Sequence, residues 1–512
     1  MKTSEILVVG AGPTGLALAL QAHDHGAHVR VIERRAEAFR PSRALIMHPP
    51  TLEALRPLGV TEALLAKANI APEGRLRVGR HEVRARLSEL ALPDTTFPHL
   101  SLVRQMDVET VLTQALADRG VEVERETELV EAWDGVATAR ATVQSRRGSE
   151  HVECDFIAGC DGPESAVRRS SGVFWCGGPY QQEIVLADIE LDVELAREAV
   201  HVVVGRRGLV FLFALGEQAT WRLLASRPSG AETLPYGQPG PAVPRADLQA
   251  TLDAAGFDAR ITMVVWSARY RVQHRLADRF RRGRLFLVGD AAHAFSPATG
   301  QGMNAGIQDA TNLGWKLAYA PSSTDCRGLL DSYERERRPT DRDALAMTHL
   351  AFWGEAATGP LPSLLRGVLV PIGAPAIPLF LGQRLLVAEA IRWISRLRVA
   401  YDDSPLSLEG VPRLWTGTRP GRRLQDRTVS VDGQWVRLHA LTSRPGIHLL
   451  LGRDAADLDA RAFGERVAIH RLSSEPGCGV VAVRPDGYVG FRCGLADARQ
   501  LRMWLASVGA LS

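Results

Sequence analysis

The chain has 512 residues, of which 46% are hydrophobic and 23% are charged, and its net charge is +3. This composition is typical of a globular protein of two or three domains, and no long basic block supports nucleic-acid binding. The six cysteines form no C-x-x-C pair, so neither a zinc knuckle nor a redox dithiol is indicated. No signal peptide is recognised, and we expect reduced thiols in a cytoplasmic protein.

The first motif lies between a predicted strand at 5–9 and a helix that begins near Leu16. It reads Gly10-Ala-Gly-Pro-Thr-Gly15, a spacing that lets the backbone approach a pyrophosphate at a helix N-terminus. A second strand is predicted at 28–32, and Glu33 follows it at the distance of a ribose-binding acid. The dinucleotide-binding residues predicted here are Gly10, Gly12, Pro13, Thr14, Gly15, Glu33 and Arg34.

The next part of the chain alternates between helices and strands. A helix pair is predicted at 51–70, strands at 74–99, and a return to the nucleotide domain at 101–112. A strand at 126–130 precedes another that ends in Asp161-Gly162, where an acid suits a sugar hydroxyl.

Residues 176–275 contain several strand-like runs separated by turns. They predict an antiparallel sheet inserted between two parts of the nucleotide domain. Four aromatic residues of this sheet could line a pocket, although aromatic side chains on a sheet more often belong to the core: Phe211, Phe213, Trp221 and Trp266.

Residues 283–317 predict a second ligand-binding turn. A buried strand at 285–288 ends at Asp290, a turn with Gly300 and Gly302 follows, and a helix runs from Met303. Such a turn presents free backbone N–H groups to an anion or to a carbonyl-rich ring. The residues by themselves indicate a dinucleotide site without specifying the cofactor.

An uncharged, apolar segment at 367–383 carries Pro371, Pro375 and Pro378. It is too short for a membrane-spanning helix, so we expect broken, buried helices and no membrane association. From Arg413 the composition shifts to short strands separated by glycine turns, and a hairpin is predicted across Pro485-Asp-Gly487.

Taken together, these runs resemble the motifs of the single-component (group A) FAD-dependent aromatic hydroxylases. The resemblance is carried by the first glycine motif, by Asp161-Gly-Pro-Glu-Ser-Ala-Val-Arg168, by the run from Gly289-Asp290 to Asn304, and by the run from Asp331 to Pro339. It implies FAD as the cofactor and NADPH or NADH as a transient co-substrate.

The resemblance also implies roles for particular residues. Asp290 would hold the ribityl chain, and the carbonyl of Pro297 would lie near the flavin N5. Arg43 would lie against the mobile flavin, which makes Arg43 and Pro297 the catalytic candidates, as positioning groups; no general base is identified. The remaining cofactor contacts implied are Gln105, Leu129, Asp161, Gly162, Gly300, Gly302, Met303 and Asn304.

The fold implied is α/β, with a discontinuous Rossmann-like FAD domain at 1–73, 100–175 and 276–345. A substrate-binding β-sheet domain at 74–99 and 176–275 is inserted into it. A helical linker at 346–400 leads to a thioredoxin-like C-terminal domain at 401–512, which lacks the redox cysteine pair.

The function implied is hydroxylation of an aromatic, polycyclic phenolic substrate of the polyketide or antibiotic type, with NAD(P)H and O2, through a flavin C4a-hydroperoxide. A homodimer is possible. Baeyer–Villiger oxidation or epoxidation on the same scaffold remains open. A non-catalytic protein that binds FAD or an aromatic ligand is the alternative from a different class.

Overall fold

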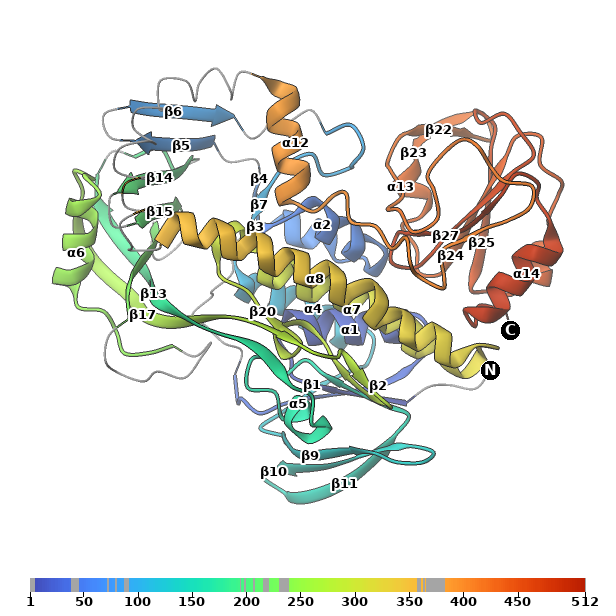
Figure 1. Cartoon of the computed structure of the whole chain (residues 1–512), viewed down its shortest axis with the longest axis horizontal. Coiled ribbons are helices and arrows are strands. Elements are labelled where there is room, and N and C mark those ends of the chain that lie inside the picture. Colours follow the sequence, from blue (N-terminus) through green and yellow to red (C-terminus); the bar gives the residue numbers. More distant parts are fainter. Residues whose placement is uncertain are drawn as a thin grey trace.

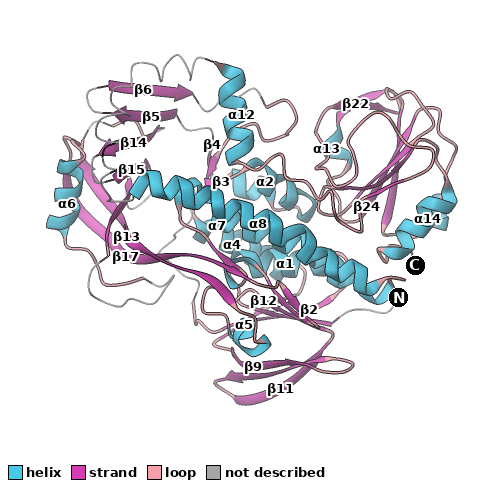
Figure 2. Cartoon of the chain, viewed as in Figure 1, coloured by secondary structure: helices cyan, strands magenta, loops and turns pink. Residues whose placement is uncertain are grey.

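The computed structural model describes residues 5–37, 46–70, 73–78, 81–86, 92–193, 195–197, 199–205, 208–214, 221–229, 239–356, 361, 364 and 383–511. Figure 1 shows an eight-stranded sheet on the left, a parallel sheet at the lower centre and the C-terminal residues as a lobe on the right. Figure 2 shows that most helices lie between these sheets.

The parallel sheet has six strands in the order β18-β19-β12-β1-β2-β8. The strands are β1 (Glu5–Val9), β2 (His28–Glu33), β8 (Val123–Arg125), β12 (Phe156–Gly159), β18 (Arg281–Arg282) and β19 (Leu285–Leu287). All neighbours are parallel except β18 and β19. The strands β1, β12 and β19 are apolar runs that are buried on both faces, as parallel sheets require.

Helices cover this sheet and connect its strands. They are α1 (Pro13–Asp24), α2 (Pro49–Leu55), α3 (Thr61–Leu65), α4 (Gln105–Ala117), α5 (Ala166–Ser171) and α7 (Gln301–Tyr319). The helices α1 and α7 pack closely at Gly306. A Cβ at this position would lie only 2.3 Å from Oγ1 of Thr14, so only glycine fits there. Two small sheets flank them: β3 (Ile46–Met47), β7 (Ser101–Leu102) and β4 (Asn69–Ile70); and β9 (Glu128–Asp134), β10 (Ala139–Ser145) and β11 (Gly148–Cys154).

The eight-stranded sheet has the order β20-β17-β13-β16-β15-β14-β5-β6. Its strands are β5 (Glu73–Val78), β6 (His81–Arg86), β13 (Trp175–Asp192), β14 (Ala199–Gly205), β15 (Gly208–Ala214), β16 (Trp221–Pro228), β17 (Arg260–Ala277) and β20 (His293–Ala294). Helix α6 (Arg245–Ala254) packs on one face. The antiparallel sheet predicted for residues 176–275 is confirmed, and β5, from an earlier part of the chain, joins it parallel to β14. These two strands come from distant parts of the chain, so no hairpin dictates their relative direction.

The helix α8 (Cys326–Ala356) crosses the middle of the molecule (Figure 1). It begins five residues before the family-like run from Asp331 to Pro339 and contains Pro339. Of the apolar segment at 367–383, only Gln383 lies within the described residues, next to α12 (Arg384–Ile394). Within the described ranges, no helix is both long and apolar enough to cross a membrane.

The C-terminal lobe contains a five-stranded sheet in the order β21-β27-β26-β24-β25. Its elements are β21 (Leu408–Glu409), β24 (Ile447–Gly452), β25 (Val467–Leu472), β26 (Val480–Val483), β27 (Val489–Cys493) and α14 (Ala498–Ser507), beside β22 (Thr428–Val431), β23 (Gln434–Arg437) and α13 (Leu438–Leu441). The predicted hairpin is confirmed, since Val483 pairs with Val489. The parallel pair β24–β25 followed by antiparallel β26 and β27 is the arrangement of a thioredoxin-like sheet, and Cys478 and Cys493 are free thiols.

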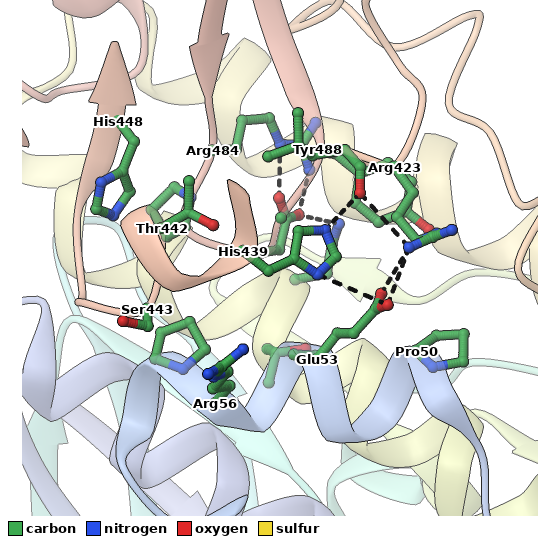
Figure 3. Close-up of a pocket in the computed structure, with 18 of the residues that line it drawn as sticks. Pro50, Glu53, Arg56, Arg423, His439, Thr442, Ser443, His448, Arg484 and Tyr488 are labelled. Carbon is green, nitrogen blue, oxygen red and sulfur yellow. Dashed lines mark hydrogen bonds and ion pairs between the residues drawn. The ribbon is translucent and has the colours of Figure 1, made fainter. Parts of the chain in front are cut away.

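The C-terminal lobe contacts α2 through charged side chains (Figure 3). Nη1 of Arg423 donates to both carboxylate oxygens of Glu53 at 3.0 and 2.9 Å, and His439 lies 3.8 Å from the same carboxylate. The cavity between these residues measures about 50 Å³. It has room for a few water molecules and is far smaller than the sites that bind aromatic ligands.

Candidate active site

A cavity of about 470 Å³ opens between the parallel sheet and the eight-stranded sheet. Motif residues line one part of it, at the carboxyl ends of the parallel strands, where open α/β sheets bind their ligands. The predicted site residues in its wall are Gly10, Gly12, Pro13, Thr14, Glu33, Arg34, Gln105, Leu129, Asp161, Gly162, Asp290, Pro297, Gly300, Gly302 and Met303. The fold therefore gathers at one cavity residues that are up to 293 positions apart.

Three glycines of the wall face open space. A Cβ built at Gly12, Gly162 or Gly302 meets no atom within 4 Å. Gly12 is also the N-cap of α1, and no side chain caps this helix. The first turn of α1 therefore offers free N–H groups and room for an anionic group, as an FAD pyrophosphate requires.

Two other glycines of the first motif are tightly packed. A Cβ at Gly10 would lie 2.5 Å from the carbonyl oxygen of Cys160, and one at Gly15 would lie 1.9 Å from the carbonyl oxygen of Gly10. Gly15 does not line the cavity. Its role in the structure is to let α1 start close to the preceding turn, rather than to contact a ligand.

The acids of the first two motifs are held by backbone N–H groups. Glu33 accepts hydrogen bonds from the N–H groups of Ala11 at 2.9 Å and Arg35 at 3.0 Å. Oδ2 of Asp161 accepts one from Ala166 at 2.6 Å, while its Oδ1 is buried without a hydrogen-bond partner among the described residues. Burial raises the pKa of Asp161. A ligand hydroxyl or amide could satisfy this oxygen, which fits a cofactor site.

Gln105, for which the resemblance implied a cofactor contact, lies at the start of α4. Its Nε2 donates to Oε1 of Glu109 at 2.8 Å, and both side chains line the cavity. Glu109 was not predicted, although its position one helical turn after Gln105 places it on the same face.

Asn304 lies behind the wall rather than in it. Its side chain is fully buried, donates to the carbonyls of Ile46 and Gly300 at 2.9 and 2.8 Å, and accepts from the N–H of His48 at 2.9 Å. The side chain thus joins the start of α7 to the segment at 46–48 instead of facing a ligand. The predicted flavin contact of Arg43 lies outside the described residues.

His48 belongs to the same framework. Its Nε2 lies 3.0 Å from the carbonyl oxygen of Thr299, and Nδ1 lies 3.2 Å from Oγ of Ser395. Burial lowers the pKa of His48 to about 4, so the ring is neutral and supports the loop that carries Gly300.

The other part of the cavity is lined by the eight-stranded sheet and the end of α8. Its apolar side chains are Ile184, Leu186, Phe211, Phe213, Leu224 and Val272, and its polar ones are Arg222, Tyr270, Arg271, Gln273 and Glu355. The polar residues were not predicted, because they lie on strands and a helix end that carry no motif. Strand alternation does place Phe211 and Phe213 on one face.

Trp221 and Trp266 do not line the cavity. Trp221 is 2% exposed and belongs to the core cluster beneath α6. Within the cavity wall, Arg222 forms a two-fold ion pair with Asp188, with both N–O distances at 2.8 Å. Gln273 is 4% exposed, and its Oε1 has no hydrogen-bond partner within the described part of the chain.

Residues 3–348 match the model of the FAD binding domain, and residues 417–509 match the model of the aromatic-ring hydroxylase C-terminal domain. The chain is 32% identical to the 12-dehydrotetracycline 5-monooxygenase/anhydrotetracycline 6-monooxygenase of Streptomyces rimosus, with 98% of each chain covered. It is 31% identical to the rifampicin monooxygenase of Streptomyces venezuelae over 85% of each chain. The solved structure of the anhydrotetracycline hydroxylase OxyS from Streptomyces rimosus superposes with a TM-score of 0.79, at 27% identity and full coverage of both chains.

A parallel sheet with a nucleotide-type cavity, together with an adjoining sheet that lines the apolar end of that cavity, defines a dinucleotide-binding protein with a substrate domain. The chain belongs to the FAD-dependent aromatic-ring monooxygenases, as the resemblance of its motifs implied. FAD is its cofactor, and NAD(P)H is the reductant of this class. The family membership also decides against a non-catalytic binding protein.

Proposed function

We propose that the chain hydroxylates a polycyclic phenol of the polyketide or antibiotic type in this cavity. The observation that carries the proposal is the continuity of the cavity, which joins the motif residues to an apolar chamber. Its volume of about 470 Å³ lies within the usual range of about 300–1,000 Å³ for small-molecule sites. The names of the relatives, which include tetracycline-type and rifampicin monooxygenases, support the same substrate class.

For the cofactor half, we infer that the first turn of α1, with Gly12, Pro13 and Thr14, binds the pyrophosphate. Glu33 would bind the adenosine ribose, and Asp290 the ribityl chain. When bound, FAD supplies the redox chemistry, accepting hydride from NAD(P)H and activating O2. Gly300, Gly302 and Met303, at the start of α7, would orient the ring and present it to the substrate chamber.

For the substrate half, the apolar side chains would bind the fused rings and exclude water, which protects reactive oxygen from side reactions. The side-chain oxygen of Gln273 would accept a hydrogen bond from a substrate hydroxyl, because this buried acceptor otherwise stays unsatisfied. Among the described residues that line the substrate half of the cavity, Glu355 supplies the carboxylate, and its side chain is 7% exposed. We assign it the role of proton acceptor for the phenol.

The test is oxidation of NADPH and NADH by the purified protein, with and without a panel of mono- to polycyclic phenols that includes anhydrotetracycline. We expect a polycyclic phenol to stimulate oxidation and to yield a product heavier by one oxygen atom. NMR of the product distinguishes a ring hydroxyl from an inserted ester oxygen or an epoxide. Stimulation by a non-aromatic ketone alone, with a lactone as product, would overturn the hydroxylase assignment.

Two further proposals concern the protein as a whole. We propose a homodimer, to be tested by light scattering after size-exclusion chromatography, where a monomeric mass would reject it. We also propose a cytoplasmic location, which cell fractionation of the producing organism tests.

A further inference from the structure

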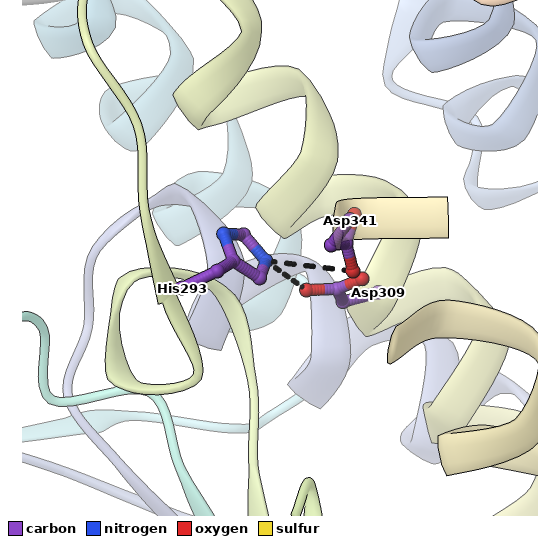
Figure 4. A group of neighbouring side chains, drawn as sticks. All are labelled: His293, Asp309 and Asp341. Carbon is purple, nitrogen blue, oxygen red and sulfur yellow. Dashed lines mark hydrogen bonds and ion pairs between the residues drawn. The ribbon is translucent and has the colours of Figure 1, made fainter. Parts of the chain in front are cut away.

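A cluster of four charged or titratable side chains lies behind the cavity wall. His293 comes from β20, Asp309 from α7, and Arg337 and Asp341 from α8. All four side chains are 0% exposed. Figure 4 shows His293, Asp309 and Asp341 converging on one point. Burying so many charged groups costs free energy unless each of them pairs with a group of opposite charge.

The geometry argues against a metal ion at this point, although the donor atoms of His293, Asp309 and Asp341 lie within 4.8 Å of one another. Nε of Arg337 donates to Oδ1 of Asp309 at 2.6 Å, and its Nη2 donates to Oδ1 of Asp341 at 3.1 Å. The guanidinium group is therefore the fixed cation that both carboxylates share.

Besides Arg337, the cluster has a second potential cation, which is the imidazole of His293 when it is protonated. Nε2 of His293 lies 2.7 Å from Oδ2 of Asp309 and 3.7 Å from Oδ2 of Asp341. Burial opposes a charge on the imidazole, but the carboxylates of Asp341 and Asp309 outweigh it and raise the pKa of His293. Burial likewise raises the pKa of Asp341 to about 7. When His293 is protonated, its charge and that of Arg337 balance the carboxylates of Asp309 and Asp341.

This cluster anchors the turn that carries Asp290. Oδ2 of Asp309 accepts a hydrogen bond from the N–H of Gly289 at 3.1 Å, and the same oxygen contacts Nε2 of His293 at 2.7 Å. Gly289 and His293 flank Asp290, so a single carboxylate oxygen holds both ends of its turn. The ring of His293 also stacks on Phe295, with centroids 4.5 Å apart, and Phe295 lines the cavity.

We propose that His293 is a positioning residue for the cofactor: through Asp309 it fixes Asp290, and by stacking it fixes Phe295. The proposal rests on the proposed contact of Asp290 with FAD. A protonated His293 forms the stronger, charge-assisted bond to Asp309. Loss of the proton from His293 would weaken this bond and leave a net negative charge behind Asp290.

Other polar groups also face the cluster. Arg396 lies 3.9 Å from Asp341, and Nη1 of Arg337 donates to the hydroxyl of Tyr401 at 3.2 Å. Burial raises the pKa of Tyr401, of Tyr333 on α8 and of Cys160 at the end of β12. Asp290 itself faces His293 from the cavity side. A raised histidine pKa means that the anchoring is present at lower pH and is lost as the pH rises through that value.

The experiment measures FAD release from the diluted holoenzyme by the recovery of flavin fluorescence. The proteins are the wild type, His293→Leu, His293→Gln and the control His201→Gln. His201 is also buried and does not line the cavity; its Nε2 lies 3.1 Å from the carbonyl oxygen of Ala196, and its ring packs edge-on against Trp221. Metal involvement is checked by dialysis against EDTA and by addition of Zn²⁺.

We expect His293→Leu to weaken FAD binding by about tenfold, the effect of losing one charge-assisted hydrogen bond. His293→Gln keeps an N–H near the position of Nε2, so it should fold and bind FAD. It should not show the weakening of FAD binding that the wild type shows as the pH rises through the raised pKa of His293. His201→Gln should bind FAD as the wild type does. Neither EDTA nor Zn²⁺ should change the affinity.

Three results would overturn the proposal: unchanged FAD affinity in His293→Leu, a pH profile in His293→Gln that matches the wild type, or recovery of affinity by Zn²⁺. The variant Asp290→Ala separates this proposal from its premise. If Asp290→Ala keeps full FAD affinity, the proposed contact of Asp290 fails. If it loses FAD while His293→Leu does not, only the positioning role fails.

Discussion

Arg484 and Glu336 form a fully buried double ion pair, with Nη1–Oε1 at 2.6 Å and Nη2–Oε2 at 2.8 Å. The pair joins the hairpin of the C-terminal sheet to α8, which also carries Arg337 and Asp341 of the cluster behind the cofactor cavity. Nζ of Lys316, on α7, donates to the same carboxylate at 2.7 Å. Buried ion pairs thus attach the C-terminal lobe to α7 and α8, the two helices that support the cofactor cavity.

Replacing this carboxylate should destabilise the whole chain. In Glu336→Gln the charges of Arg484 and Lys316 stay buried without their shared partner. We expect a loss of about 3–5 kcal/mol in the free energy of unfolding, measured by urea denaturation. The control Asp402→Asn breaks an exposed pair with Arg422 and should cost less than about 1 kcal/mol. Equal losses in both variants would contradict the interpretation.

The same carboxylate should make the free energy of unfolding depend on pH in the acidic range. Burial favours the neutral form of Glu336, but Arg484 and Lys316 outweigh burial and hold its pKa well below the ordinary value of 4.5. Such a group contributes stability above its unfolded pKa and loses it as the pH falls. We expect the unfolding free energy to fall steeply below about pH 5, and less steeply in Glu336→Gln. Parallel profiles for the two proteins would rule out this role.

The two kinds of glycine in the first motif should respond differently to alanine. A methyl group at Gly12 meets open space in the cavity, while one at Gly15 would collide with the carbonyl oxygen of Gly10. We expect Gly12→Ala to fold with wild-type thermal stability but to lose FAD affinity, and Gly15→Ala to lose stability. Flavin absorbance and thermal unfolding measure the two effects. A Gly12→Ala protein that keeps its flavin would show that the cofactor does not approach this backbone.

Gln273 should govern substrate affinity without affecting the cofactor. Leucine has a similar size but cannot accept a hydrogen bond, so we expect Gln273→Leu to raise KM for a phenolic substrate by about tenfold. FAD content and the NAD(P)H oxidation rate without substrate should not change. As a control, Phe211→Leu shortens the apolar wall, and it should raise KM for larger ring systems more than for monocyclic phenols. An unchanged KM in Gln273→Leu would remove the side chain from the substrate contacts.

Glu355 should act in the chemical step. We expect Glu355→Gln to lower kcat by about 10²-fold or more, as loss of a proton acceptor does, with little change in KM. The rate should recover with rising pH in the variant, because the phenol then ionises in solution. A wild-type kcat at neutral pH would refute the assignment.

Much of this protein could be predicted from local patterns. The glycine motifs between strands and helices, the acids at strand ends and the hairpin at Pro485-Asp-Gly487 depend on backbone geometry over a few neighbouring residues, which the residue types themselves determine. For this reason most of the strands and helices were predicted correctly, and so was the family, and most of the motif residues proposed to bind the cofactor line one cavity.

The tertiary structure alone decided which residues meet across the fold. The parallel pairing of β14 with β5, the buried position of Asn304, the polar wall around Gln273 and Glu355, and the contact of His293 with Asp309 all join segments that no local pattern relates. Their side chains find partners only when the sheets and helices pack, because burial makes an unpaired polar group costly and so selects one arrangement of the whole chain. Local sequence determines the elements and their ligand-binding turns, and global packing determines what supports them.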